Sequence, residues 1–327
     1  SYVELILRGQ NMLKIAVQMD PIMHIDPKGD STFALMREAQ SRGFELFHYH
    51  PDDLCLRDGV LSAHGQEVEV MEGPQHARLG ATQTLALDGF DVILLRQDPP
   101  FDMSYITTTH LLEHVTDKVL VVNDPVAVRN APEKLLVLHY PELMPPTLVT
   151  RNIDDIRAFR REFGDIIVKP LFGNGGAGVF KISPQDPNLS SLLELFFQQS
   201  RESLMVQQYL PDVVQGDKRI ILADGDVIGA INRVPQPGEA RSNMHVGGRA
   251  EKVQLTERDL EICAAIGPLL RQQGLVFVGI DVIGHFITEI NVTSPTGLQE
   301  LDRFDEINSA AMIWDKIVAR HGEKHAG

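Results

Sequence analysis

The segment VKPLFGNGGAGVFKI, residues 168–182, places four glycines between two apolar runs, each of which carries a lysine. The runs predict two strands of a hairpin with a long glycine-rich tip. Because glycine has no side chain, the backbone N–H groups of such a tip can approach a polyphosphate closely. Lys169, directly before the tip, can neutralise phosphate charge, and a flexible tip can close over a nucleotide. The segment has no GxxxxGK(S/T) pattern and opens no helix with Gly-x-Gly-x-x-Gly, so a plain surface turn remains the alternative.

Acidic and amide side chains gather in the segment DVIGHFITEIN, residues 281–291. Glu289 and Asn291 are two residues apart, so on a strand they share one face. A two-residue turn at Gly284 and His285 would face Asp281 away from them, whereas a three-residue loop from Ile283 to His285 would put all three on one face. Two carboxylates and an amide carbonyl form an all-oxygen set that suits Mg²⁺. We therefore predict a metal site here, with an exposed polar strand face as the alternative.

Cationic side chains recur in GDKRI, residues 216–220, at Arg233, and in VGGR, residues 246–249. Arginine can stabilise charge that develops on a transferring phosphoryl group or on a tetrahedral oxyanion. The polar segment 235–251 is long for a loop in a compact domain, and such loops are often active-site lids. A surface salt bridge is the ordinary explanation for any one arginine. Together these segments predict a magnesium–nucleotide site on an antiparallel hairpin architecture, not a P-loop.

The composition argues against several classes of partner and of cellular location. The 327 residues include 30 basic and 45 acidic side chains, which give a net charge of −15 and argue against a nucleic-acid or anionic-membrane partner. No apolar run is long enough to span a bilayer. Cys55 and Cys263 form no CxxC pair and no disulfide framework, which fits a reducing compartment, so we predict a cytoplasmic protein. Residues 1–11 lack a signal-peptide pattern and are interpreted as an extension before the first strand.

The first third of the chain alternates predicted strands and helices. Strands are expected at 13–19, 44–50, 90–96 and 118–123, with helices at 31–43 and 105–116. This alternation predicts an α/β domain, residues 12–132, with a doubly wound parallel sheet. Ligands of such sheets lie beyond the carboxyl ends of the strands. The polar residues expected at those ends are Asp20, Arg96, Asp98, Asn123 and Asp124.

The pattern changes near residue 133, where strand pairs become more frequent. We predict two α+β subdomains built on antiparallel sheets, residues 133–206 and 207–327. The first holds the glycine-tipped hairpin and helices near 153–164 and 189–200. The second holds the strand pairs at 217–234 and 277–291.

The order of these segments resembles the ATP-grasp superfamily, in which two α+β subdomains hold ATP between antiparallel sheets. The shared segments are EKL, IIVKP with its glycine loop, QQYLP, GDKRI and the pair D…EIN. Within that superfamily the chain is similar to the prokaryotic glutathione synthetases from about residue 12 to 310. The segments RQDPPFD and EINVTSPTG are the most specific part of this resemblance. Asn174 in the glycine loop and Ala131–Pro132 before EKL depart mildly from the family pattern.

The resemblance implies an ATP-dependent ligase that joins γ-glutamylcysteine to glycine and releases ADP and phosphate through an acyl phosphate. It implies ATP and Mg²⁺, with Mn²⁺ as a substitute, and a homotetramer. ATP would be bound by Lys134, Lys169, Gly173, Gly175, Gly176, Gln208, Tyr209, Leu210 and Asp217, and the metal by Asp281, Glu289 and Asn291. Arg219 and Arg233 would act in catalysis, and Asp20, Ser31, Arg249, Ser294 and Thr296 would lie near the peptide or glycine.

Three other functions remain alternatives at this stage. A D-alanine–D-alanine or glutamate-adding ligase would keep the nucleotide and metal residues but should lack RQDPPFD and EINVTSPTG. A non-catalytic ATP-binding protein would not need the intact acidic and arginine residues. A nucleotide-binding oxidoreductase should carry a glycine fingerprint after its first strand, where this chain has MDPIMHIDPKGD.

Overall fold

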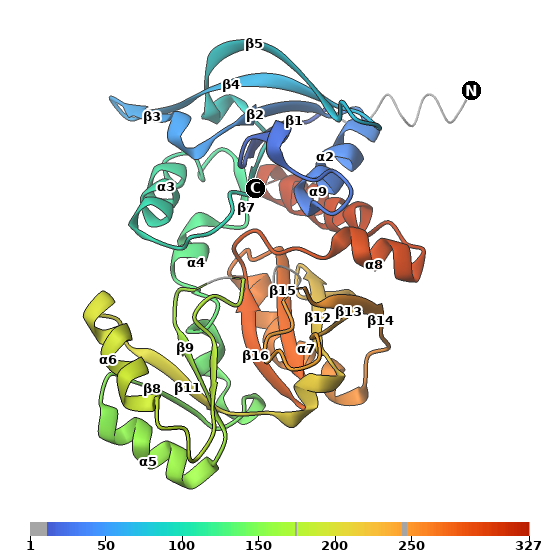
Figure 1. The fold of residues 1–327 in the computed structure, drawn as a ribbon. Coiled ribbons are helices and arrows are strands. Elements are labelled where there is room, and N and C mark those ends of the chain that lie inside the picture. The colour runs from blue at the N-terminus through green and yellow to red at the C-terminus, as the bar shows by residue number, and fades with distance from the viewer. Residues whose placement is uncertain (1–11, 174, 244–246, 327) are drawn as a thin grey trace.

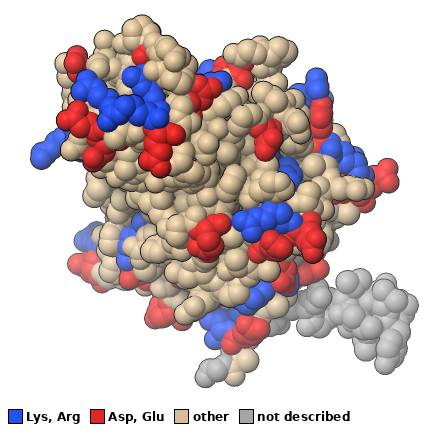
Figure 2. Space-filling model, turned by 90° about the horizontal axis from the view of Figure 1, so that it is seen from below, with Lys and Arg blue, Asp and Glu red and all other residues tan. Residues whose placement is uncertain are grey.

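The computed structural model describes residues 12–173, 175–243 and 247–326, which form three sheets with helices around them (Figure 1). The possible extension at 1–11 and the unusual loop residue Asn174 lie outside the described residues. Among the helices of the described part, none combines the length and the apolar character that a membrane span requires. On the face that Figure 2 shows, lysine and arginine side chains are interspersed with aspartate and glutamate.

The N-terminal sheet has seven strands and contains the predicted parallel core. Its order is β3-β4-β2-β1-β6-β7, with β5 paired to β4. The parallel strands are β1 (Lys14–Gln18), β2 (Glu45–Tyr49), β6 (Val92–Leu95) and β7 (Leu120–Val122). Because β2 lies on one side of β1 and β6 on the other, this part is doubly wound, as the alternation of strands and helices predicted.

The same sheet continues beyond β2 as antiparallel hairpins that the sequence analysis did not assign. They are β3 (Leu54–Arg57), β4 (Val60–Val70) and β5 (Ala77–Ala86). Much of β5 is exposed, so its side chains lack the apolar alternation that marks a half-buried strand. The sheet is therefore mixed, with a parallel core and an antiparallel extension.

Helices from both ends of the chain pack on this sheet (Figure 1). From the N-terminal third come α2 (Ser31–Ser41), α3 (Met103–Glu113) and α4 (Pro125–Arg129), whose N-caps are Asp30, Asp102 and Asp124. From the C-terminus comes α9 (Ser309–Ala326), whereas the preceding helix α8 (Leu298–Asp305) contacts α2, α9 and the C-terminal sheet. The sequence analysis assigned neither helix. Trp314 of α9 donates a hydrogen bond of 2.8 Å to the Leu35 carbonyl of α2 and packs edge-on against Phe44.

The central sheet is antiparallel, with the order β10-β9-β11-β8. Its strands are β8 (Thr147–Thr150), β9 (Ile166–Pro170), β10 (Phe180–Ile182) and β11 (Leu204–Gln208), and its helices are α5 (Ile153–Phe163) and α6 (Leu189–Gln199). The pairing of β9 with β10 confirms the hairpin around the glycine loop. Two 3₁₀ turns, Leu136–His139 and Pro141–Leu143, precede β8.

The C-terminal sheet is also antiparallel, with the order β14-β13-β12-β15-β16. Its strands are β12 (Asp217–Ala223), β13 (Asp226–Val234), β14 (Arg249–Lys252), β15 (Phe277–Ile283) and β16 (Phe286–Asn291). The expected loop 235–251 ends early, because β14 pairs with β13 from Arg249 on. Helix α7 (Glu257–Gln272), with a capping box at Thr256, was not expected from the sequence.

The remaining short elements are 3₁₀ turns at Ile22–His24, Pro51–Asp53, Leu87–Gly89 and Pro211–Gln215. The domain boundaries at residues 132/133 and 206/207 stay predictions.

Candidate active site

A cavity of about 690 Å³ is lined by residues of the central and C-terminal sheets and by loop residues of the N-terminal domain, such as Arg96 and Asp98 after β6. It contains the glycine loop, the acidic face of β15 and β16, and the arginines of β12 and β13. Of the site residues predicted from sequence, sixteen line it: Lys134, Lys169, Gly173, Gly175, Gly176, Gln208, Tyr209, Leu210, Asp217, Arg219, Arg233, Asp281, Glu289, Asn291, Ser294 and Thr296.

Three predicted substrate residues lie outside the cavity wall. The Ser31 hydroxyl is buried and accepts hydrogen bonds from the backbone N–H groups of Gly297 and Leu298, so it stabilises a loop. Asp20 lies 3.7 Å from the His50 ring, and Arg249 pairs with Glu251 on the exposed strand β14. Their positions give no support to a direct role in substrate binding.

The acidic face forms by a route that neither sequence alternative contained. The turn has two residues, Gly284 and His285, since Ile283 pairs with Phe286. A β-bulge then adds Thr288 to β16, so that Asp281 pairs with Glu289 and Gly279 pairs with Asn291. The extra residue reverses which face of the sheet the following side chains of β16 point to. Asp281, Glu289 and Asn291 therefore share one face.

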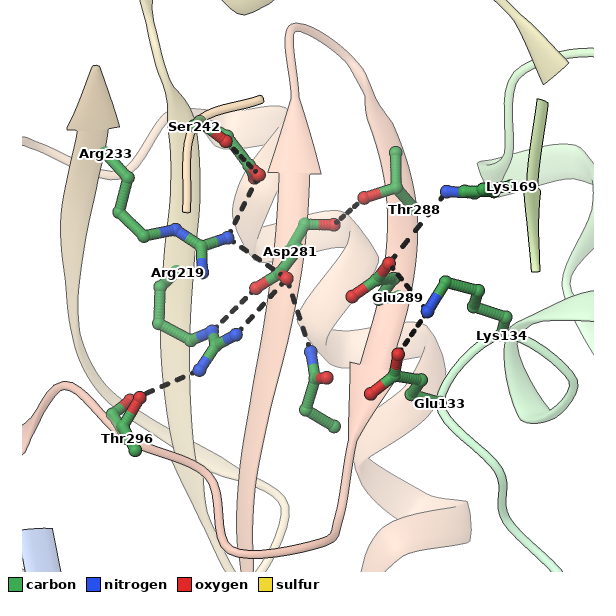
Figure 3. Close-up of polar contacts among 12 residues, drawn as sticks. Glu133, Lys134, Lys169, Arg219, Arg233, Ser242, Asp281, Thr288, Glu289 and Thr296 are labelled. Carbon is green, nitrogen blue, oxygen red and sulfur yellow. Dashed lines mark hydrogen bonds and ion pairs between the residues drawn. The ribbon is translucent and has the colours of Figure 1, made fainter. Parts of the chain in front are cut away.

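Asp281 is the centre of a buried ionic network (Figure 3). Its carboxylate accepts two hydrogen bonds from Arg219, at 2.6 and 3.2 Å, and lies 3.0 Å from Arg233 Nη2. The Asn291 amide donates to it at 3.3 Å. Burial alone would raise the pKa of Asp281, but the two guanidinium groups outweigh burial and hold that pKa well below its usual range.

Glu289 faces Lys134 and Lys169 (Figure 3). Its carboxylate lies 3.4 Å from Lys134 Nζ and 3.9 Å from Lys169 Nζ. Lys134 also donates to the Gly173 carbonyl at 2.9 Å, which ties it to the glycine loop, and it pairs with Glu133. Burial lowers the pKa of Lys169. The Glu289 carboxylate, at 3.9 Å, opposes this shift without cancelling it.

Asp217 joins the network to the long loop that follows β13. Its Oδ2 accepts hydrogen bonds from Arg233 at 3.0 Å and from the Ser242 hydroxyl at 2.8 Å. Its Oδ1 is buried and has no hydrogen-bond partner among the described residues. Burial raises the pKa of Asp217 to about 6, although Arg233 opposes this shift. An unpartnered buried carboxylate oxygen is a place for a donor or a cation.

The glycine loop and the loop after β13 contact each other over the cavity. Gly176 has a φ of +79°, and a Cβ there would lie 2.7 Å from Asn243 Oδ1. Arg241 Nη1 donates to the Gly176 carbonyl at 3.4 Å. Gly176 therefore meets both requirements for glycine, a left-handed backbone and a close neighbour. The two loops that the sequence analysis treated as phosphate loop and lid meet at this point.

Several residues of the cavity were missed by the sequence analysis. Glu133, Arg241 and Ser242 line it, as do Asp30 and Glu300 at its N-terminal end. Arg96 and Asp98, expected at the rim of the parallel sheet, also line it, whereas Asn123 is buried and bonds to the Phe277 and Val292 carbonyls. The adjacency of Glu133 to Lys134 could have drawn attention to it, but no local pattern marks Ser242 or Glu300.

Gly279 provides the space that Arg219 needs. A Cβ at this position would lie 2.8 Å from Arg219 Cδ and 3.2 Å from its Nε. We expect Gly279→Ala to push the guanidinium away from Asp281 and to lower kcat about 100-fold, the usual effect of losing one charge-stabilising donor. Steady-state assays would measure this, with Gly80→Ala on strand β5 as control, because a Cβ there makes only ordinary contacts with Glu67 on β4. A Gly279→Ala variant with unchanged kcat would contradict the expectation.

Glu133 makes stability depend on pH. Burial, and then the Glu289 carboxylate, raise the pKa of Glu133 to about 7 from 4.5. Between pH 4.5 and pH 7 the folded protein binds more protons at Glu133 than the unfolded chain does. The contribution of protonated Glu133 to the free energy of unfolding is therefore complete below pH 4.5 and is lost as pH rises through 7. Glutamine does not titrate, so the Glu133→Gln variant should not lose this part of its stability. We expect its free energy of unfolding, relative to that of the wild type, to rise by about 1–3 kcal/mol from about pH 5 to about pH 8. Urea unfolding would test this, with the exposed Glu142→Gln as control, and a constant difference would contradict it.

Two family models match the chain and together cover most of it. Residues 13–129 match the prokaryotic glutathione synthetase N-terminal domain, and residues 133–306 match the prokaryotic glutathione synthetase ATP-grasp domain. The chain belongs to the prokaryotic glutathione synthetase family. This confirms the resemblance seen in the sequence.

Curated glutathione synthetases are similar to the chain over nearly its whole length. The protein from Brucella melitensis is 60% identical over 94% of this chain and 99% of its own, and that from Mesorhizobium japonicum is 59% identical over 93% and 98%. The protein from Vibrio cholerae is 44% identical over 94% and 98%. The predicted function in glutathione biosynthesis, as an ATP-grasp ligase, is thereby confirmed.

Solved structures show the same fold at low sequence identity. The D-cycloserine synthetase DcsG superposes with a TM-score of 0.65 at 15% identity, covering 94% of this chain and 99% of that one. The ATP-grasp ligase PsnB, in a complex with a precursor variant, Mg and ADP, gives 0.59 at 18% identity, with coverage of 94% and 98%. At these identities the likeness confirms the ATP-grasp fold.

Proposed function

We propose that the chain joins γ-glutamylcysteine to glycine with ATP and releases glutathione, ADP and phosphate. Membership of the prokaryotic glutathione synthetase family supports this reaction. The single observation that carries it further is the cavity itself, in which one wall combines lysines and glycines and the facing wall combines carboxylates with two arginines. Such cationic and metal-binding groups can offset the repulsion between a triphosphate and a substrate carboxylate that are bound side by side.

ATP is assigned to the end of the cavity between the central and C-terminal sheets. Lys134 and Lys169 would neutralise its phosphates, and Gly173, Gly175 and Gly176 would cover them. Gln208, Tyr209 and Leu210 would line the base pocket next to β11, with Asp217 nearby. The support for this placement is that all of these residues line one cavity and that Lys134 is bonded to the glycine loop.

Asp281, Glu289 and Asn291 suit Mg²⁺, with Mn²⁺ as a substitute. They offer oxygens on one face, and the unpartnered Asp217 Oδ1 lies in the same network. In the described part of the chain no three His, Cys, Asp or Glu side chains form a metal-binding group, so oxygens from phosphate and water must complete the shell. The metal would screen the repulsion between the triphosphate and the substrate carboxylate.

Arg219 and Arg233 are assigned to the charge that develops during the reaction. In the structure both hold Asp281, so they lie next to the predicted metal ligands. There they can stabilise the acyl phosphate of the cysteinyl carboxylate and the tetrahedral species formed when the glycine amine attacks. The loop after β13, joined to Asp217 through Ser242, would exclude water from the acyl phosphate.

Coupled ADP release with MgATP, γ-glutamylcysteine and glycine, each omitted in turn, tests this function. We expect release only when all are present. A parallel series with D-alanine in place of both acceptors separates a sister ligase, which would release ADP only there. Tight ATP binding without release in either series would contradict a ligase altogether. The homotetramer and the cytoplasmic location stay predictions.

A further inference from the structure

Two phenylalanines from distant parts of the sequence stack on each other beside the cavity wall. Phe101 follows strand β6 of the N-terminal sheet, and Phe172 follows strand β9 of the central sheet. Their ring centroids are 6.3 Å apart, and their ring planes differ by 16°. Both rings are half-buried and pack against one apolar cluster. Neither is among the described residues that line the cavity, so the proposed ATP and metal site gives this stack no role.

The phenylalanine of the N-terminal domain is held in place by its neighbours. Pro99 and Pro100 directly precede Phe101, and proline restricts the backbone. Asp102 directly follows it and caps helix α3, where its carboxylate accepts a hydrogen bond of 3.0 Å from the Tyr105 N–H. The Phe101 ring also packs against the buried Tyr105 ring, at a centroid distance of 5.5 Å. Phe101 is therefore a fixed surface against which the ring of another segment can pack.

The phenylalanine of the central sheet leads directly into the glycine loop. Phe172 is followed by Gly173, whose carbonyl accepts a hydrogen bond of 2.9 Å from Lys134 Nζ. The ammonium group of Lys134 also pairs with Glu133 and lies 3.4 Å from Glu289 (Figure 3). Of these three contacts, the Gly173 carbonyl is the one that comes from the glycine loop. The Phe172 ring is thus one residue away from the carbonyl that holds Lys134.

Gly173 cannot fix this carbonyl through a side chain of its own. A Cβ there would lie 2.8 Å from Pro170 Cγ and 3.1 Å from the Ala177 carbonyl oxygen, so close packing excludes one. Glycine also has the widest choice of backbone conformations, and its orientation therefore depends on the residues beside it. The residue before Gly173 is Phe172, and its stack with Phe101 supplies that restraint.

We propose that Phe101 and Phe172 are positioning residues that hold the ammonium group of Lys134 in place for the phosphates of ATP. The stack fixes the backbone at Phe172, and through Gly173 it fixes the carbonyl that Lys134 contacts. This rests on the proposed function, in which Lys134 is assigned to ATP. The N-terminal domain thereby contributes to ATP binding, although ATP is assigned to the end of the cavity between the other two sheets.

Titration calorimetry with Mg²⁺ and the non-hydrolysable analogue AMPPNP measures the effect without turnover. We expect Phe101→Ala and Phe172→Ala each to raise the Kd about 3- to 10-fold, which is the stacking energy of an aromatic pair expressed as a fold-change. Steady-state assays should show the same rise in the KM for MgATP, with the KM for γ-glutamylcysteine and for glycine unchanged. Phe163→Ala is the matched control and should change neither constant, since Phe163 of helix α5 is half-buried and also pairs with a phenylalanine, Phe159.

Combined variants show whether the stack acts through Lys134. If the two rings act as one unit, the Phe101→Ala/Phe172→Ala double variant should raise the Kd no further than the larger single change. Lys134→Ala removes the group that the stack positions, so adding Phe101→Ala to it should change the Kd less than about 2-fold. Phe172→Tyr keeps the ring and should bind the analogue nearly as tightly as the wild type. A stack that only stabilised the fold would show none of these dependences, because the Kd of the folded protein would stay unchanged.

The outcomes separate this proposal from the proposed function. A wild type that binds AMPPNP but makes no glutathione would overturn the function alone, and the Kd values would still decide on the stack. An unchanged Kd in both alanine variants, or full additivity of Phe101→Ala with Lys134→Ala, would overturn the stack as a positioning device. A rise in KM confined to γ-glutamylcysteine would also overturn it, because Phe101 would then act only within its own domain. If an alanine variant does not fold, Phe172→Leu takes its place, since leucine keeps the apolar packing without the ring, and it should raise the Kd at least about 2-fold.

Discussion

Replacing Asp281 by asparagine is expected to abolish measurable ligase activity and to destabilise the protein. Asp281 is a proposed metal ligand, and losing a metal contact worth several kcal/mol in the transition state lowers kcat by about 1,000-fold or more. The same change removes the carboxylate that Arg219 and Arg233 share. Two buried guanidinium groups then lack that partner, which costs about 3 kcal/mol of folding free energy.

Activity and stability must be measured together to interpret this variant. ADP release at saturating substrates gives kcat, and urea unfolding with and without MgATP gives the free energy of unfolding. Lys316→Gln is a suitable control, because it breaks an ion pair with Asp226 whose side chains are 38% and 55% exposed and which contributes little. If the Asp281→Asn variant kept about a tenth of the wild-type kcat, Asp281 would be excluded as a metal ligand.

Trp314→Ala is expected to destabilise the fold by about 4 kcal/mol, which is the usual cost of removing a fully buried aromatic side chain. Trp314 is 0% exposed and joins α9 to α2 through its hydrogen bond to Leu35 and its contact with Phe44. The lost side chain leaves a cavity between helices from opposite ends of the sequence. Trp314→Phe should cost less, because it keeps most of the apolar contact and loses the hydrogen bond.

Far-UV circular dichroism in urea is the right measurement, because Trp314 is the only tryptophan of the chain and fluorescence would be lost with it. Met312→Ala on the same helix is the control, since Met312 is 38% exposed and should cost less than about 1 kcal/mol. If Trp314→Ala were no more destabilising than Met312→Ala, α9 would not be an integral part of the fold.

Local patterns were enough to predict several of the strands that carry the candidate site residues. The glycine-tipped hairpin and the strand pair that carries Arg219 and Arg233 lie where the sequence placed them, and Glu289 and Asn291 share one face of β16 as alternation predicted. These features depend on neighbours within about ten residues, which a single sequence displays directly. The family resemblance added the order of the segments and the reaction.

Local alternation could not predict how the acidic face of β15 and β16 forms. The two-residue turn was one of the alternatives, and it implied that Asp281 faced away from Glu289. The bulge at Thr288 reverses that conclusion, and its presence depends on how β15 packs between β12 and β16. Alternation alone cannot reveal an extra residue in a ladder.

Contacts between segments that are distant in the sequence could not be predicted for a different reason. Arg96 bonds to Pro295, and Ser242 bonds to Asp217, across separations that no local pattern encodes. Helices α8 and α9 were missed, and the return of α9 to the N-terminal sheet is a property of the tertiary fold. The exposed hairpins β3 to β5 were missed because a strand with little burial carries little apolar signal.

The return of α9 to the N-terminal sheet affects how the protein is made. During synthesis the ribosome releases β1 to β6 long before Trp314 and Ile317, which share one apolar cluster with Val17 and Phe44. At about 5–20 residues per second, roughly 10–40 s pass between Leu95 and Trp314. For that time the nascent N-terminal sheet lacks its closing helix, so we expect this surface to be the one that needs a chaperone during translation.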